Sequence, residues 1–182
     1  DMAVFRFLKA LADLDKPLVA AVRGRAVGIG LTMLLHCDLV FMSTTATLTT
    51  PFIKLALTPE AGSTRLLPER IGHQRAFAMF AFGESLTASE AVDLGLAYRM
   101  VEPEELESAA WTAASRLADL SIGSLTRTKR MMRRAETIRE QVDLETDLFY
   151  ECLLAPDAAE AFAAFRDGRE PDYRAVGKAA ES

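Results

Sequence analysis

Two short apolar runs on either side of a glycine-containing segment constrain the fold of this chain more than any other feature. Residues 18–22 are apolar and of strand length, as are residues 38–42 apart from Asp38. Gly24, Gly28 and Gly30 lie between these runs, followed by leucines at helical spacing. Continuous apolar runs are typical of buried strands, and glycine permits a tight connection from a strand to a helix. This order of strand, turn, helix and strand predicts an α/β fold with a layered core.

The remaining elements are predicted from periodicity and from residues typical of helix ends. Further strands are expected at 46–50 and 97–101, and Thr87 and Glu90 have the spacing of a capping box at the start of a short helix. A helix is predicted over residues 1–16, with Val4, Leu8, Leu11 and Ala12 on its apolar face. Another is expected to begin with Thr58 as its cap and with Pro59 and Glu60 in its first turn. Further helical patterns are found over residues 68–82, 104–120, 124–134, 138–154 and 158–166. The polar residues from Glu170 onward are expected to fray.

Composition places the chain among water-soluble globular proteins. Half of its 182 residues are hydrophobic and 26% are charged, with a net charge of -5, so no general attraction to nucleic acid or to an anionic membrane is expected. No apolar run is long enough to span a bilayer. The cysteines, Cys37 and Cys152, show no metal-type spacing and suggest no disulfide framework, which favours a reducing compartment.

The glycine segment is a candidate site for negative charge. Backbone N–H groups at a helix start, such as that of Ile29, can stabilise an oxygen that gains charge. The segment lacks the lysine and serine of a nucleotide P-loop, and Met33 stands where a dinucleotide-binding loop has a small residue. The glycines could instead serve only to let strand and helix pack closely, and the spacing leaves both interpretations open.

Glu60 is the candidate acid–base residue. It follows residues 52–57, which are apolar apart from Lys54, and it precedes Ala61 and Gly62. Burial there would raise its pKa toward a value useful for a general base, although Lys54 would oppose this if it lay close. The alternative is an ordinary acidic residue that favours a helix N-terminus.

The other polar candidates have weaker support. His36 has no second ligand at metal-binding spacing, so a packed histidine and no metal site are expected, and His73 falls in a polar helix start. Serine or cysteine nucleophiles lack the required sequence context. A basic cluster is expected to form a solvated helix face, with phosphate contact as the alternative; it consists of Arg127, Lys129, Arg130, Arg133 and Arg134.

Three segments resemble the crotonase, or enoyl-CoA hydratase/isomerase, superfamily over nearly the whole chain. Residues 16–30 are similar to its KPxIAAVxGxAxGGG segment, residues 37–48 to its CDxxxAxxxAxF stretch, and residues 86–97 to its LTAxEAxxxGLV signature. The resemblance implies a spiral of β-β-α units and an acyl-CoA thioester as ligand. It divides the chain into a partial α/β core, 1–102, and a helical region that builds trimers, 103–182. It also implies that the N-terminal part of the usual fold, with the first oxyanion donor and the loop that contacts the CoA adenine, is absent from this chain.

The resemblance also implies roles for individual residues. The second oxyanion-hole N–H of the family falls on Ile29, whereas the two catalytic glutamates of the hydratases fall on Thr32 and Phe52, so hydration by the usual pair is not expected. Residues 49–64 are similar to the TPF…PEGxS segment of the Δ3,Δ2-enoyl-CoA isomerases, whose single catalytic glutamate matches Glu60. The implied catalytic residues are Glu60 and Ile29, and the implied substrate-binding residues are Gly28, Gly30, Thr32, Phe52 and Leu55.

These correspondences imply a Δ3,Δ2-enoyl-CoA isomerase of fatty acid metabolism, in which one glutamate shifts a double bond through an enolate. The alternatives are another acyl-CoA enzyme of the family, such as an isomerase of a ring-derived acyl-CoA or an atypical hydratase, and a non-catalytic acyl-CoA-binding subunit. No separate cofactor is expected, because coenzyme A is part of the substrate. The expected assembly is a homotrimer or a dimer of trimers without nucleic acid or membrane partners, and the C-terminal Ala-Glu-Ser, which is no peroxisomal signal, favours the cytoplasm.

Overall fold

The strands form two three-stranded sheets in an α/β fold, in a computed structural model that describes residues 3–180. In the first sheet the order is β1-β3-β6 and all strands are parallel; these are Val19–Val22, Leu39–Ser43 and Arg99–Val101. The second has the order β2-β4-β5, with β4 parallel to β2 and antiparallel to β5; these are Arg25–Val27, Thr47–Thr49 and Leu86–Thr87. Because β1 and β2 are consecutive but belong to different sheets, the chain between Val22 and Arg25 crosses from one sheet to the other.

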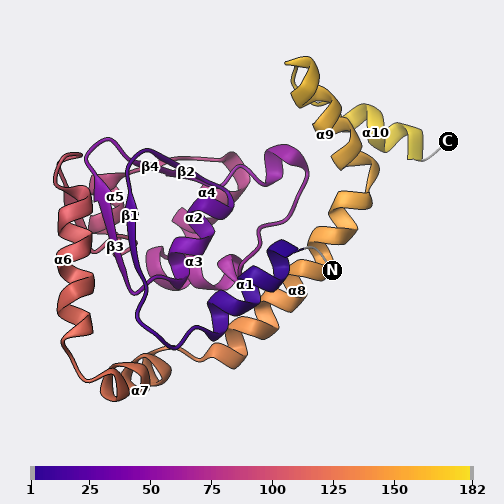
Figure 1. Cartoon of the computed structure of the whole chain (residues 1–182). Coiled ribbons are helices and arrows are strands. Elements are labelled where there is room, and N and C mark those ends of the chain that lie inside the picture. The colour runs from indigo at the N-terminus through magenta and orange to yellow at the C-terminus, as the bar shows by residue number, and fades with distance from the viewer. Residues whose placement is uncertain (1–2, 181–182) are drawn as a thin grey trace.

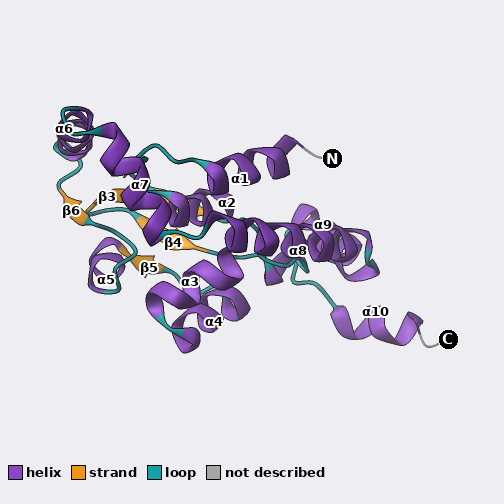
Figure 2. Cartoon of the chain, turned by 90° about the horizontal axis from the view of Figure 1, so that it is seen from below, coloured by secondary structure: helices purple, strands orange, loops and turns teal. Residues whose placement is uncertain are grey.

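Over the described residues, one helix precedes the first strand, several connect the strands, and the rest follow the last strand. Helix α1, Ala3–Asp13, comes before β1. The connecting helices are α2 Ile29–Thr32, η1 Met33–His36, η2 Ile53–Leu55, α3 Ser63–Ile71, α4 His73–Phe82 and α5 Ala88–Asp93. The helices after β6 are α6 Leu106–Ala118, α7 Ile122–Met132, α8 Ala135–Leu154, α9 Pro156–Asp167 and α10 Tyr173–Ala180. Figure 1 shows α6 against β1 and β3, and α1 along α8. In Figure 2, α9 and α10 lie at the end of the molecule opposite α6.

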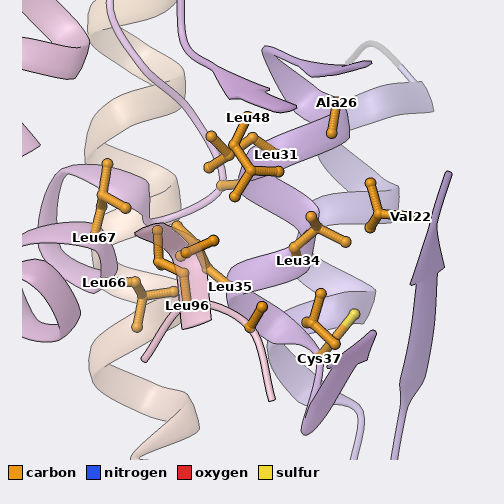
Figure 3. Close-up of a cluster of buried hydrophobic side chains, with 14 of the residues drawn as sticks. Val22, Ala26, Leu31, Leu34, Leu35, Cys37, Leu48, Leu66, Leu67 and Leu96 are labelled. Atoms are coloured by element: carbon orange, nitrogen blue, oxygen red, sulfur yellow. The ribbon is translucent and has the colours of Figure 1, made fainter. Parts of the chain in front are cut away.

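The core lies between α2, the second sheet and α3. Figure 3 shows Leu31 and Leu35 between the strand residues Ala26 and Leu48 and the α3 residues Leu66 and Leu67. Burial of several leucines there stabilises the fold by about 1.5–3 kcal/mol for each side chain. The site described below is built on α2 and on the turn before α3, so both of its parts are anchored in this core.

Most predicted elements are found within a few residues of their expected bounds, and the capping box of Thr87 and Glu90 is confirmed. The helix predicted over 68–82 is wrong as a single element, because Gly72 with φ 80° and ψ 155° separates α3 from α4. Strand β2 was not predicted; it lies within the glycine segment. The residues from Glu170 onward do not simply fray, since they contain α10.

Two further corrections concern helix faces and helix starts. In α1 the buried residues are Phe5, Leu8, Leu11 and Ala12, whereas Val4 is exposed. The helix expected after Thr58 begins later, at Ser63, so Glu60 lies in the turn before α3 and not in a first helical turn. This difference matters for Glu60, because a side chain in a connecting turn can be buried between elements.

Candidate active site

Glu60 lies in a buried turn between η2 and α3. Its side chain is 6% exposed. The next two residues both have left-handed backbone conformations, with φ 67° at Ala61 and 70° at Gly62. Such a conformation is costly for alanine and persists only where neighbouring contacts hold it. The turn therefore points the Glu60 side chain into the protein, where its surroundings determine its chemistry.

One oxygen of the Glu60 carboxyl has a hydrogen-bond donor and the other has none. Thr32 Oγ1, itself fully buried, donates to Glu60 Oε1 over 2.5 Å. Glu60 Oε2 is buried and has no hydrogen-bond partner among the described residues. A buried carboxylate normally has its lone pairs satisfied, so Oε2 is the oxygen of this carboxyl that the described residues leave open to a proton or a donor.

The electrostatics of this site favour the protonated form of Glu60. Burial raises the pKa of Glu60 to about 7, the Thr32 hydrogen bond opposes this rise, and the negative charge of Glu145 adds to it. Lys54, which would oppose this rise only if it lay close to Glu60, has its side chain against Gly83 and is not among the causes of the shift. At neutral pH such a carboxyl can both take and return a proton.

The glycine segment lies next to this carboxyl. Ile29 begins α2 and Thr32 ends it, so the short helix that contacts Glu60 through Thr32 also carries the Ile29 N–H at its start. Gly28 has φ 56°, and its carbonyl accepts from the N–H groups of Leu31 and Thr32 at 2.9 and 3.0 Å. The Ile29 N–H has no acceptor within the described part of the chain. The Ile29 N–H, at the start of α2, is thus available to donate to an oxygen outside the helix.

The structure brings together some of the predicted substrate-binding residues. A side chain at Gly28 would lie 3.8 Å from the Phe52 ring, so the buried Phe52 covers this glycine. Thr32 contacts Glu60, as described above. Gly30 and Leu55 are half-buried on α2 and η2. The catalytic and substrate-binding roles of all these residues remain predictions.

Glu145 is a buried acid that the sequence analysis missed. It lies on α8 and is 3% exposed. Its carboxylate accepts from the N–H groups of Gly62 and Thr64 and from the Thr64 hydroxyl. Burial raises the pKa of Glu145, and these donors oppose the rise. In the sequence Glu145 is one of several acids on a helical pattern, and nothing local distinguishes it from the exposed ones.

The basic cluster is not simply the solvated face that was expected. Lys129 is buried and forms an ion pair with Asp38 at 2.7 Å. Arg133 donates to Nδ1 of His36, which is packed as predicted, and His36 Nε2 lies 2.7 Å from the Ala61 carbonyl. Burial and the charge of Arg133 lower the pKa of His36 to about 4, so the ring is neutral and donates Nε2–H to Ala61.

The remaining features of the described residues bear less on this site. A pocket of 520 Å³ lies between α6 and the first sheet, and another of the same volume lies between η1, α3 and α7; neither is lined by Glu60. Over residues 3–180 no cluster of acidic, histidine or cysteine side chains could hold a metal ion. In the same range, every helix is too short or too polar to cross a bilayer.

Comparison with known proteins defines the class. The model of the enoyl-CoA hydratase/isomerase family matches residues 1–176. An enoyl-CoA hydratase/isomerase from Pseudoalteromonas atlantica shares 38% identity with a TM-score of 0.91 over 95% of this chain and 71% of that one. The fold and the match together are those of the crotonase superfamily of acyl-CoA enzymes. The predicted α/β fold of this superfamily is confirmed. The chain belongs to the enoyl-CoA hydratase/isomerase family.

Curated relatives include both isomerases and hydratases. The 1,2-epoxyphenylacetyl-CoA isomerase of Escherichia coli is 34% identical over 94% of this chain and 68% of the relative. The peroxisomal enoyl-CoA delta isomerase 3 of Mus musculus is 39% identical over 71% of this chain, which spans only 41% of that relative. A probable enoyl-CoA hydratase of Rhizobium meliloti is 31% identical over 90% of this chain and 65% of that relative. The family is therefore established, and the reaction within it is not.

Proposed function

We propose that this protein is a Δ3,Δ2-enoyl-CoA isomerase in which Glu60 is the acid–base residue. The observation that carries the proposal is the buried Glu60 carboxyl, which has the Thr32 hydroxyl on one oxygen and no partner among the described residues on the other. Phe52 lies close to Gly28 of the glycine segment that carries Thr32. The resemblance places the two catalytic glutamates of the hydratases at Thr32 and Phe52. Neither residue can activate water or deliver a proton to carbon, which favours isomerisation over hydration.

The proposed reaction moves one proton. Glu60 breaks the C–H bond at C2 of a 3-enoyl-CoA, and the electron pair passes into a dienolate whose thioester oxygen carries the charge. The Ile29 N–H stabilises this oxygen as an oxyanion-hole donor. Protonated Glu60 then forms the new C–H bond at C4, the double bond moves to C2–C3, and the carboxylate is regenerated.

The surroundings of Glu60 suit both halves of this cycle. With a pKa of about 7 the carboxyl is ionised in part of the molecules at neutral pH and is strong enough as an acid to return the proton. Phe52 and other apolar neighbours limit access of water to the intermediate. A positioned acid–base contributes about 10²–10⁴ in rate and one oxyanion donor about 10²–10³.

Glu60→Gln tests the proposal most simply. Gln keeps the size of the side chain but cannot accept the proton, so turnover of a 3-enoyl-CoA by the whole protein should fall by about 10²–10⁴-fold while the thioester still binds. Glu69→Gln, an exposed position on α3, is the control and should be neutral. An active protein that keeps its turnover after Glu60→Gln would overturn the proposal, and a wild-type protein that binds without turnover would favour a non-catalytic acyl-CoA-binding subunit.

A second candidate substrate follows from one relative. The name of the E. coli relative is that of an isomerase of an epoxyphenylacetyl-CoA, so a ring-derived acyl-CoA is the alternative for the same Glu60 and Ile29. Product analysis with a linear 3-enoyl-CoA and with a ring epoxide thioester separates the two. The proposed assembly into trimers rests on the resemblance alone.

A further inference from the structure

The carboxylate of Glu145 joins the C-terminal helices to the turn that carries Glu60. From α8, its Oε2 accepts from the Gly62 N–H over 2.5 Å, and its Oε1 accepts from the Thr64 N–H and Oγ1 over 2.9 and 2.5 Å. These donors belong to the first turn of α3, where helical N–H groups lack partners within the helix. Partners more than 80 positions apart in the sequence thus meet two residues after Glu60.

A second side chain binds the same peptide group of the turn as Glu145 does, at its carbonyl oxygen. Neutral His36 donates to the Ala61 carbonyl over 2.7 Å, and Arg133 fixes the ring through Nδ1. The Ala61 carbonyl and the Gly62 N–H belong to one peptide group, which joins the left-handed residues Ala61 and Gly62. An unfavourable backbone conformation that is bound on both sides has little freedom, so the direction of the Glu60 side chain depends on the two contacts.

We propose that Glu145 is a positioning residue for Glu60: its carboxylate fixes the turn of residues 60–62 through the first turn of α3 and holds a negative charge behind the Glu60 carboxyl. The inference deepens the proposed function and rests on Glu60 being the acid–base of that reaction. Glu145 itself has both oxygens engaged by the protein and needs no contact with substrate.

The hydrogen bonds decide which of the two acids carries the charge. Within the part of the chain that the structure describes, three donors stabilise ionised Glu145, whereas the Glu60 carboxyl has one donor. Of two neighbouring buried acids, the one with fewer donors retains its proton to higher pH. The other titratable group at this turn, His36, is neutral near pH 7, and of the described residues only Glu145 adds a charge effect to the pKa of Glu60.

Three variants on α8 separate these contributions. Glu145→Gln keeps a hydrogen-bond acceptor and removes the charge, and Glu145→Ala removes both. Asp143→Asn is the matched control, because it neutralises an exposed acid on the same helix that pairs with Lys9. Each variant is assayed in the whole protein for kcat and KM as functions of pH, and the Glu60 carboxyl is titrated by ¹³C NMR.

We expect Glu145→Gln to move the Glu60 titration, and the rise of kcat/KM with it, to lower pH. The kcat of Glu145→Ala should fall by about 10²-fold with little change in KM, because displacement of a catalytic group by about 1 Å is enough for such a loss. Asp143→Asn should match the wild type in both measurements. If the Glu60 titration and kcat are unchanged in Glu145→Gln, the positioning role is wrong.

The two proposals fail in different ways. If the wild-type protein has no isomerase activity but Glu145→Gln still moves the Glu60 titration, the proposed function fails and the link between the two acids stands. If both Glu145 variants unfold, amide hydrogen exchange in the wild type tests the positioning role of Glu145 instead. Slow exchange of the Gly62 and Thr64 amide hydrogens supports the proposal that Glu145 fixes the turn, and fast exchange of these hydrogens overturns it.

Discussion

Glu60 and Glu145 are equally well buried but have very different partners. The carboxylate of Glu145, which is carried by α8, accepts from three donors at the start of α3. Among the described residues, Glu60 has the Thr32 hydroxyl on one oxygen and no partner on the other. Burial opposes the charge of both acids, but hydrogen bonds offset more of this penalty at Glu145. The difference shows that burial alone does not set the proton affinity of a carboxyl; the number of donors also decides which acid retains its proton to higher pH, and the proposed reaction needs such a group at Glu60.

The strongest test of this contrast is the pH dependence of folding stability. The pKa of Glu60 is about 7 in the fold against an ordinary 4.5, so its contribution to stability is fully present below pH 4.5 and is lost as the pH rises through 7. Glu60→Gln removes this loss. At pH 8 the variant should be more stable than the wild type by about 3 kcal/mol, since each of the roughly 2.5 pKa units between 4.5 and 7 is worth 1.36 kcal/mol, and near pH 4 the two should agree.

Urea denaturation at both pH values measures this difference. Asp143→Asn, at an exposed acid, provides the control and should show no such dependence on pH. Equal stabilities of Glu60→Gln and the wild type at pH 8 would mean that Glu60 is not buried as a costly charge.

A substitution at Gly62, whose N–H donates to Glu145, should change the stability of the fold less than Glu60→Gln does. A Cβ at Gly62 would lie 3.3 Å from Ile138 Cγ2, at a backbone φ of 70°. Gly62→Ala should therefore destabilise the fold by about 1–3 kcal/mol through backbone strain and crowding. Gly168→Ala has a similar φ but open space around it, so it measures the strain alone. If thermal unfolding shows the same loss for both variants, Ile138 does not restrict the turn.

The smallest expected effect is that of the Thr32 hydroxyl. Thr32→Val removes the one donor to Glu60, which should raise the pKa of Glu60 further and cost about 1 kcal/mol in hydrogen bonding. Thr50→Val is the matched control, because Thr50 is fully buried and its hydroxyl has no partner within the described residues. A ¹³C titration that finds Glu60 unchanged in Thr32→Val would remove Thr32 from the account.

The two acids also differ in how far the sequence could predict them. The capping box of Thr87 and Glu90 and the apolar strands β1 and β3 depend on neighbours in the chain, so local patterns were enough. Glu60 was found through a motif that resembles a family, although its position before α3 was not predicted. Glu145 and Arg133 act across more than 80 positions, and their contacts arise only when α7 and α8 pack on the core. Such contacts are set by tertiary packing, on which local periodicity carries no information.

The pH dependence of kcat/KM for isomerisation of a 3-enoyl-CoA by the whole protein tests the central claim most directly. Because Glu60 must be ionised to accept the C2 proton, the rate should rise with pH through a single apparent pKa near 7. A rate that is already at its plateau above pH 5, or that shows no dependence on an acidic group, would contradict the role of Glu60.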